Sequence, residues 1–249
     1  IIAFFTKASE ANPQNASAHY FLGLALWHQG TLDESLGLFK RASELEPNEA
    51  RHHFSLANNL RALKKLDEAI IAYEKCIELK GSTADYHGQF AVALELKGRR
   101  ADAISSWQKS LEIDAKYVRA HTALAWHFAT TPDPKLRDPQ AALAHARQAV
   151  ELQPRTRDHW SNLGVALWRT GESQAAVLAL EKADQLAKNR DHFHRFFLAM
   201  AYWQTGAKDK GRQTYDQGVQ WMDKNQPKNE ELRRFRAEAE ELMGINSKP

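Results

Sequence analysis

The strongest constraint on the fold of this chain is an internal repeat of 34 residues. Three sets of apolar or small residues return at that interval. They are Leu22, Leu56, Phe90 and Leu124; Phe5, Phe39, Tyr73 and Trp107; and Ala8, Ala42, Cys76 and Ser110. Because three independent sets share one period, the chain is predicted to consist of repeated supersecondary units, each too small to bury a core without its neighbours.

Each repeat has the pattern of two helices joined by a turn. In the first half of a repeat, apolar residues recur at helical spacing, as Tyr20, Leu24 and Trp27 do. A glycine such as Gly30 then ends that helix. The second helix carries a small residue, an aromatic residue and another small residue. Each unit is therefore predicted to be a helical hairpin.

The residues within each repeat resemble the tetratricopeptide repeat family. The stretches HYFLGLAL…SLGLFKRASELEP and WSNLGVAL…AAVLALEKA are similar to the family pattern W-x2-L-G-x2-Y, followed by A-x3-F and a closing proline. The resemblance covers essentially the whole chain. It implies an all-α fold, a right-handed α-solenoid (superhelix) of antiparallel helix-turn-helix units, whose first helices line a concave groove.

The repeat register predicts a single array over residues 1–249. Six complete units occupy residues 16–225 and begin near residues 16, 50, 84, 118, 157 and 192. Residues 1–15 match the second helix of a truncated repeat, and residues 226–249 are predicted to form a C-terminal capping helix and tail. We interpret a five-residue insertion within 130–139 as a longer turn inside the fourth repeat. Gly211 and Gly218 occupy the small positions of the sixth unit, which we expect to be softer.

The composition excludes several classes of function. The chain has 34 basic and 31 acidic residues, a net charge of +3, and its basic clusters are flanked by acidic residues, so no nucleic-acid partner is expected. A single cysteine, Cys76, excludes an intramolecular disulfide and suits a reducing, cytoplasmic location. No apolar run is long enough to span a membrane. The first residues lack signal-peptide features, and we expect them to continue a longer chain.

The polar motifs predict neither an enzyme nor a metal site. His19, His53, His87 and His121 recur every 34 residues, with Trp160 in the matching position of the fifth repeat. Stacked helices lie ~8–10 Å apart, whereas two ligands of one zinc ion lie within about 4 Å, so we interpret these histidines as packing residues. An S-x-x-K spacing begins at Ser106 but lacks its companion motifs. No catalytic residue, metal or cofactor is predicted.

The family resemblance implies a partner-binding groove built from fixed positions of each first helix. These positions give Tyr20, Trp27, Phe54, Asn58, Arg61, Arg119, Trp126, Trp168, Phe196 and Trp203. Aromatic residues interleaved with arginine are typical of interface hot spots. The expected ligand is a protein or peptide segment with apolar side chains. The alternative is that the terminal aromatic residues pack against the missing first unit, the capping helix or the insertion.

Three hypotheses for the function stay open at this point. The first is a non-enzymatic scaffold for protein–protein interaction that binds an extended or helical segment in its groove. The second is a regulatory or substrate-docking arm of a larger enzyme, because the chain also resembles repeat segments of large bacterial multidomain proteins, some of which carry serine/threonine kinase domains. The third is self-assembly into a homo-oligomer through the unpaired N-terminal edge around Phe5.

Overall fold

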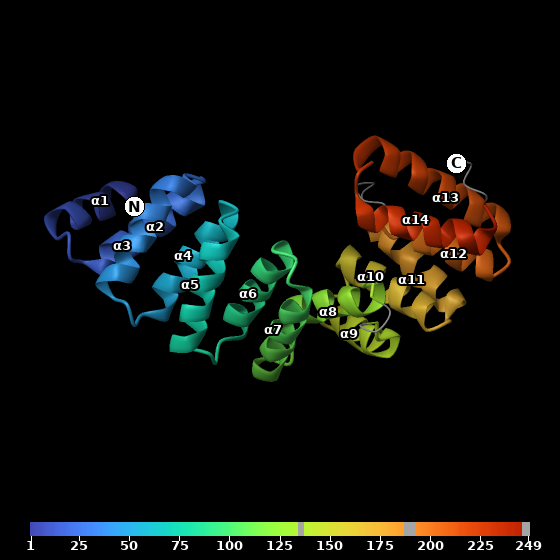
Figure 1. Cartoon of the computed structure of the whole chain (residues 1–249), viewed down its shortest axis with the longest axis horizontal. Helices are drawn as coiled ribbons and strands as arrows, with labels where there is room; N and C mark the ends of the chain where they lie inside the picture. The colour runs from blue at the N-terminus through green and yellow to red at the C-terminus, as the bar shows by residue number, and fades with distance from the viewer. Residues whose placement is uncertain (134–136, 187–192, 246–249) are drawn as a thin grey trace. The chain divides into compact units, whose positions relative to one another are not determined.

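The computed structural model describes residues 1–133, 137–186 and 193–245, which form helices and turns without a strand (Figure 1). The prediction of an all-α helical repeat solenoid is confirmed. Contacts divide the chain into two compact units, Ile1–Ala120 and His121–Pro249. We call them unit 1 and unit 2. A single array over residues 1–249 stays a prediction.

Unit 1 is a stack of helical hairpins preceded by one helix. Its helices are α1 (Ile2–Ala11), α2 (Ala16–Gln29), α3 (Leu32–Leu45), α4 (Ala50–Ala62), α5 (Leu66–Leu79), α6 (Ala84–Leu96) and α7 (Arg100–Ile113). Three hairpins form from α2 with α3, α4 with α5, and α6 with α7. The second helix of a hairpin also packs against the first helix of the next one, and α1 packs against α2 in the same way.

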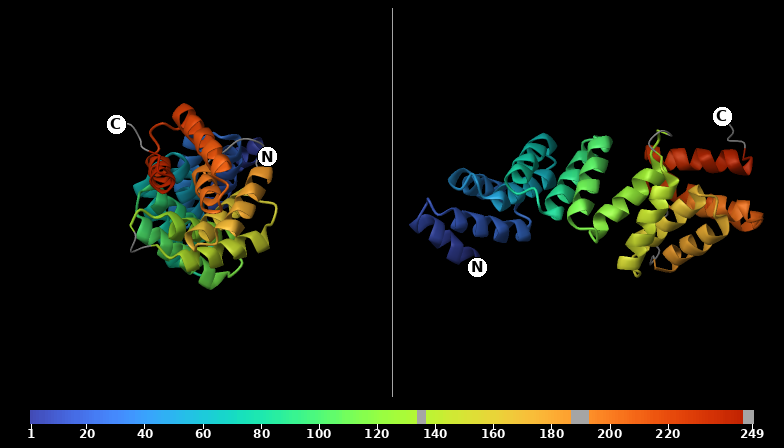
Figure 2. Two further views of the ribbon diagram at one scale, coloured as in Figure 1. Left: turned by 90° about the vertical axis from the view of Figure 1, so that its right-hand side faces the viewer. Right: turned by 90° about the horizontal axis from the view of Figure 1, so that it is seen from below.

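Unit 2 continues with hairpins and ends in a single helix. Its helices are α8 (Val118–Thr130, which begins before the boundary), α9 (Pro139–Leu152), α10 (Arg157–Arg169), α11 (Ser173–Leu186), α12 (Arg195–Gln204), α13 (Lys208–Asn225) and α14 (Glu230–Met243). The last helix, α14, lies beside α12 (Figure 2). Part of the predicted insertion, 134–136, and the predicted repeat start near residue 192 lie outside the described residues.

The core of unit 1 is built from the aromatic and small residues of the second helices. Phe39, Tyr73 and Trp107 are almost completely buried, and so are Ala42, Cys76 and Ser110. The Phe39 ring lies against a small residue of the first helix of its hairpin, Gly23. At Gly23 an added Cβ would lie 2.9 Å from Cε1 of Phe39, so the two helices approach too closely for any larger residue there.

The recurring histidines have a polar role that sequence analysis missed. The Nε2 atoms of His19, His53 and His87 each donate a hydrogen bond to the carbonyl oxygen six residues earlier, at 3.0, 2.9 and 3.0 Å. In the fifth repeat the indole Nε1 of Trp160 donates to Pro154 O at 2.8 Å in the same way. Histidine and tryptophan replace one another here because both carry a ring N–H. Each bond fastens the first turn of a hairpin to the preceding loop.

Glycine in the last hairpin of unit 2 has a packing reason. A Cβ added at Gly211 of α13 would lie 3.0 Å from Ala199 O and 3.3 Å from Trp203 N, both backbone atoms of α12. Backbone atoms cannot move aside as a flexible side chain can, so the close approach of α12 and α13 requires glycine here. The expectation of a softer sixth unit considered only the helix propensity of Gly211 and omitted this contact.

Gly211→Ala is expected to lower the free energy of unfolding by about 1–2 kcal/mol, because the new methyl group overpacks the α12–α13 contact. Gly37 in α3 is the matched control, since an added Cβ there has no neighbour within 4 Å. Gly37→Ala should raise stability by about 0.5–1 kcal/mol through helix propensity alone. Urea unfolding followed by circular dichroism measures both. A stabilised Gly211→Ala variant would contradict this explanation.

Candidate functional site

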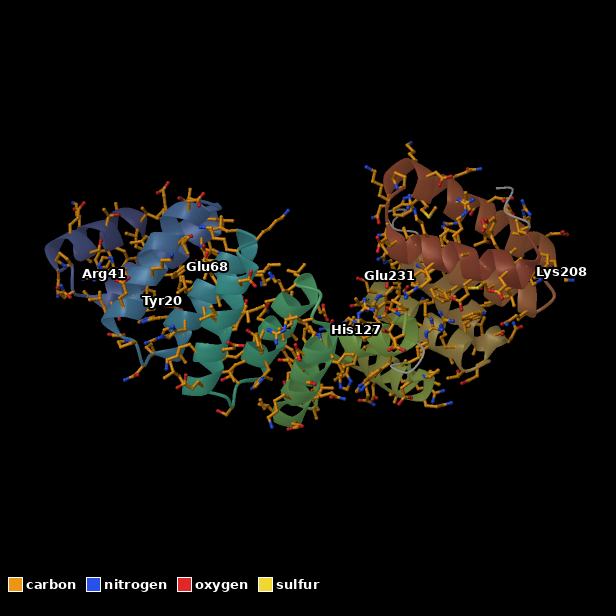
Figure 3. All side chains as sticks on the ribbon, viewed as in Figure 1. Tyr20, Arg41, Glu68, His127, Lys208 and Glu231 are labelled. Carbon is orange, nitrogen blue, oxygen red and sulfur yellow. The ribbon has the colours of Figure 1, made fainter. Side chains whose placement is uncertain are left out.

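The first helices of unit 1 present half-buried aromatic rings that neighbouring side chains hold in place. Tyr20 of α2 lies 4.9 Å from the His52 ring between centroids, and the Arg51 guanidinium lies over it at 5.7 Å (Figure 3). Phe54 of α4 contacts Tyr86 with centroids 4.6 Å apart. Because these rings are packed on one side and partly exposed on the other, they offer apolar area at small entropic cost.

A hydrogen-bonded network connects α4 to α6 on the same side of unit 1. The Tyr73 hydroxyl donates to Asn58 Oδ1 at 2.6 Å and accepts from Arg61 Nε at 3.2 Å. Arg61 also donates to Gln89 Oε1 at 3.3 Å, and Gln89 Nε2 donates to Asp85 Oδ1 at 3.3 Å. Burial raises the pKa of Tyr73 to about 12, so its proton remains available for this network at neutral pH.

We call the exposed side of α2, α4 and α6 the first-helix face of unit 1. It brings together five of the predicted residues, Tyr20, Trp27, Phe54, Asn58 and Arg61, all of them half-buried. Sequence analysis did not include Gln89 and Asp85 in this face. Asp85 occupies the second position of its repeat. Counting positions within the repeats could therefore have predicted that it belongs to this face. Arg119, at the start of α8, is exposed and lies next to Tyr117.

In unit 2 the corresponding side of the first helices is covered by α14. Phe235 of α14 is fully buried and contacts Trp126 of α8 and Phe197 of α12, with ring centroids 5.8 and 4.7 Å apart. Arg169 of α10 donates two hydrogen bonds to the Glu238 carboxylate, one of them at 2.8 Å, and a third to Ala129 O at 2.9 Å. The predicted capping helix therefore lies across the first helices α8, α10 and α12.

Contacts within unit 2 change the interpretation of four predicted groove residues. Trp126 packs against α14, and Trp168 contacts Phe197 with centroids 5.5 Å apart. Phe196 is only 1 % exposed and lies beside Tyr215 of α13, so the structure places it in the core rather than in a groove. Trp203 stays half-buried, with the Lys208 ammonium 5.2 Å from its ring centroid.

A hollow of about 310 Å³ lies between α8, α10 and α14. Thr122 and Trp126 of α8, Asp158 and Asn162 of α10, and Glu231 of α14 line it. The Asn162 side chain donates to Thr122 O at 3.0 Å, which uses its amide group to join α10 to α8. This hollow therefore lies beside the covering helix α14.

Two histidines of unit 2 form a partly buried pair. Nδ1 of His121 in α8 lies 3.0 Å from Nδ1 of His145 in α9, so one ring donates a proton and the other accepts it. The Phe128 ring stacks on His145 with centroids 6.0 Å apart. Burial, with the charge of His121 as a second cause, lowers the pKa of His145 to about 4, and Asp138 opposes this shift. The pair is stable only while at least one ring is neutral.

Ser106 and Cys76, two residues of types that can act as nucleophiles, are both buried. Among the described residues, no three histidine, cysteine or acidic side chains come together as a possible metal site. Ser106, of the S-x-x-K spacing, donates its hydroxyl to His87 O at 2.9 Å. Burial raises the pKa of Cys76 to about 12, so this thiol is not a nucleophile at neutral pH. No helix in the described part of the chain is both long and apolar enough to cross a membrane.

Comparison with known proteins identifies the repeat. Two family models, both described as tetratricopeptide repeat, match residues 3–45 and 135–191 and residues 50–83. Among curated proteins, no sequence gives a significant match.

Three solved structures with this fold are similar over most of the chain. PilF of Pseudomonas aeruginosa is 17% identical with a TM-score of 0.69, over 90% of this chain and 97% of its own. PilW, a type IV pilus biogenesis factor, is 16% identical with a TM-score of 0.66, over 88% and 97%. YrrB, described as having an unusual peptide-binding site, is 21% identical with a TM-score of 0.61, over 75% and 93%. Identities this low establish the fold alone.

Acidification is expected to destabilise the protein through His145. Unfolded His145 takes up a proton below about pH 6.5, whereas the folded residue does so only near pH 4, so stability is lost as the pH falls between these values. At pH 5 this one residue should lower the free energy of unfolding by about 2 kcal/mol relative to pH 7. Urea unfolding at several pH values measures the effect.

His145→Asn, which keeps a polar group near the position of Nδ1, should reduce this dependence on pH. The buried His52, whose pKa desolvation also lowers, contributes in the same direction and remains in the variant. His28→Asn, at an exposed histidine of α2, is the control. In this variant the free energy of unfolding should change with pH as it does in the wild type. If the His145→Asn variant lost as much unfolding free energy on acidification as the wild type, the explanation through His145 would be contradicted.

Proposed function

Since this chain belongs to the tetratricopeptide repeat family, we propose that it is a non-enzymatic scaffold that binds a partner segment on the first-helix face of unit 1. The family and fold support a role in protein–protein interaction. The partner is a protein or peptide segment with apolar side chains. The residues that contact it are Tyr20, Trp27, Phe54, Asn58 and Arg61, together with Gln89.

The contrast between the two units carries this proposal. In unit 2 an amphipathic helix, α14, already lies across the first helices and buries Leu232, Phe235 and Ala239 there. Within unit 1, none of the described helices lies across α2, α4 and α6 in this way. In unit 2, α14 therefore covers the side formed by the first helices. In unit 1, no described helix of that unit covers the first-helix face.

The chemistry of the open face suits a peptide. Tyr20 and Phe54 provide partly exposed rings against which apolar side chains can pack. Between and beside them, Asn58, Arg61 and Gln89 are already fixed by hydrogen bonds, so they lose little further freedom when they bond a peptide backbone. The peptide-binding site named for YrrB, which shares this fold, supports the same class of ligand.

The proposal predicts that peptides selected from a random displayed library by the whole protein bind the first-helix face of unit 1. Arg61→Ala and Asn58→Ala should each weaken such a peptide about tenfold, because each removes a fixed polar contact at the centre of the interface. Ile71→Ala is the matched control. Ile71 is 66% exposed on the second helix α5, and its loss should leave the affinity unchanged within about twofold.

Hydrogen exchange with and without the peptide gives an independent measurement. Protection is expected in α2, α4 and α6 and not in the exposed parts of α3 and α5. A library that yields no binder, or binders that protect only the second helices, would contradict the proposal. Circular dichroism of each variant confirms that a lost affinity does not reflect lost structure.

A further inference from the structure

The hollow between α8, α10 and α14 in unit 2, of about 310 Å³, has no role in the function proposed above. Its α14 side is fixed in place. Asn229 Oδ1 accepts a hydrogen bond from Leu232 N at 3.0 Å in the first turn of α14, and Arg234 donates to Thr130 O of α8. Sites for small ligands occupy about 300–1,000 Å³, so this hollow suits a single side chain. Because its walls are held before a ligand arrives, binding requires little further ordering.

Two oxygen atoms on nearly buried residues of α10 face this hollow. Ser161 and Asn162 both line it, and each is only 7% exposed. The Asn162 amide nitrogen donates to Thr122 O at 3.0 Å, but its Oδ1 and the Ser161 hydroxyl make no hydrogen bond with any residue that the structure describes. Neither oxygen is completely enclosed. Both are therefore available to accept hydrogen bonds from a ligand.

Three charged residues line the hollow, and two of them are acidic. They are Asp158, Glu231 and Arg157. The Arg157 guanidinium donates twice to Asp158, and both bonds end on Oδ1, so the Oδ2 atom accepts from no residue in the described part of the chain. Glu231 Oε1 lies 3.5 Å from Arg234 of the same helix, and the Glu231 side chain is 30% exposed. A ligand with a positive charge is therefore favoured over an anion.

Aromatic rings complete the lining. Trp126 of α8 and Phe193 both contribute to it. Phe235 holds the Trp126 ring at a centroid distance of 5.8 Å, and Trp221 holds the Phe193 ring at 6.4 Å. A planar guanidinium stacks on such a ring and presents five N–H donors, whereas an ammonium group is a compact and strongly hydrated charge. Aromatic rings combined with oxygen acceptors therefore favour arginine over lysine.

We propose that this hollow binds the side chain of an arginine residue of a partner protein. The guanidinium donates to Ser161 Oγ, Asn162 Oδ1 and Asp158 Oδ2 and packs on Trp126. The carboxylate of a free amino acid has no counterpart in the lining, because Arg157 is already bonded to Asp158. The site shares no residue with the first-helix face of unit 1, so it does not depend on the function proposed above.

A blocked tripeptide, acetyl-Gly-Arg-Gly-amide, is the probe. Its titration into the whole protein is followed by the NMR signals of the Asn162 side-chain amide and the Trp126 indole, which should shift until the site is saturated. The same tripeptide with citrulline, which has the shape of arginine without its charge, should bind about tenfold more weakly. With lysine in place of arginine, binding should be about fivefold weaker.

Ser161→Ala should weaken binding of the arginine peptide about tenfold, because it removes an acceptor for a charged donor. The variant should keep its structure, since this hydroxyl bonds to no described residue. Glu231→Gln, which removes a negative charge from the lining, should weaken binding about threefold. Glu34→Gln is the matched control. It makes the same change in net charge at an exposed position of α3, outside the lining of the hollow, and should leave binding unchanged.

The proposal fails if the arginine peptide gives no saturable shift, or if the citrulline or lysine peptide binds as tightly as the arginine peptide. It fails equally if the Ser161→Ala protein binds like the wild type while circular dichroism shows its helix content intact. Asn58→Ala and Arg61→Ala, in the first-helix face of unit 1, should leave these shifts unchanged, which separates the two sites.

Discussion

The structure depends on burial that neighbouring hairpins provide for one another. A hairpin such as α2 with α3 leaves one side of its second helix open until the next first helix covers it. The distance between the two helices of this hairpin is set by a large residue on the second helix, Phe39, and a small residue on the first helix, Gly23. Each of these contacts joins only neighbouring helices. The free energy of unfolding is therefore expected to be a sum of contributions from single hairpins and from the contacts between neighbouring hairpins.

The same rule applies to α14. In unit 2 the hairpin of α12 and α13 is followed by α14, whose Phe235 covers Phe197. Arg169 bonds both oxygens of Glu238 while remaining 10% exposed, which fixes the orientation of α14 as well as its position. The covering helix therefore completes the core of unit 2 at the same time as it occupies the first-helix face.

The fold was predictable from the sequence because the period, the helical spacing and the glycine at four of the hairpin turns, Gly30, Gly98, Gly171 and Gly206, agree with one another. The candidate site was predictable only in part. The register places Phe54 and Asn58 on one side of α4, because residues four apart lie on the same side of a helix. It could not show that Trp126 is covered, because the partner of Trp126 is Phe235, more than a hundred residues later in a helix outside the repeat pattern. The histidine bonds were missed for a different reason, since spacing shows which residues recur and not which atoms they contact.

Native-state hydrogen exchange of Phe39→Ala tests most directly whether burial is shared only between neighbours. Phe39 is 1% exposed, and its loss leaves a cavity between α2, α3 and α4 that should lower the opening free energies of these helices by about 3 kcal/mol. The account predicts that the opening free energies of α6 and α7 stay within about 0.5 kcal/mol of the wild type. An equal loss throughout unit 1 would contradict it, because a single cooperative core would then hold all of its hairpins together.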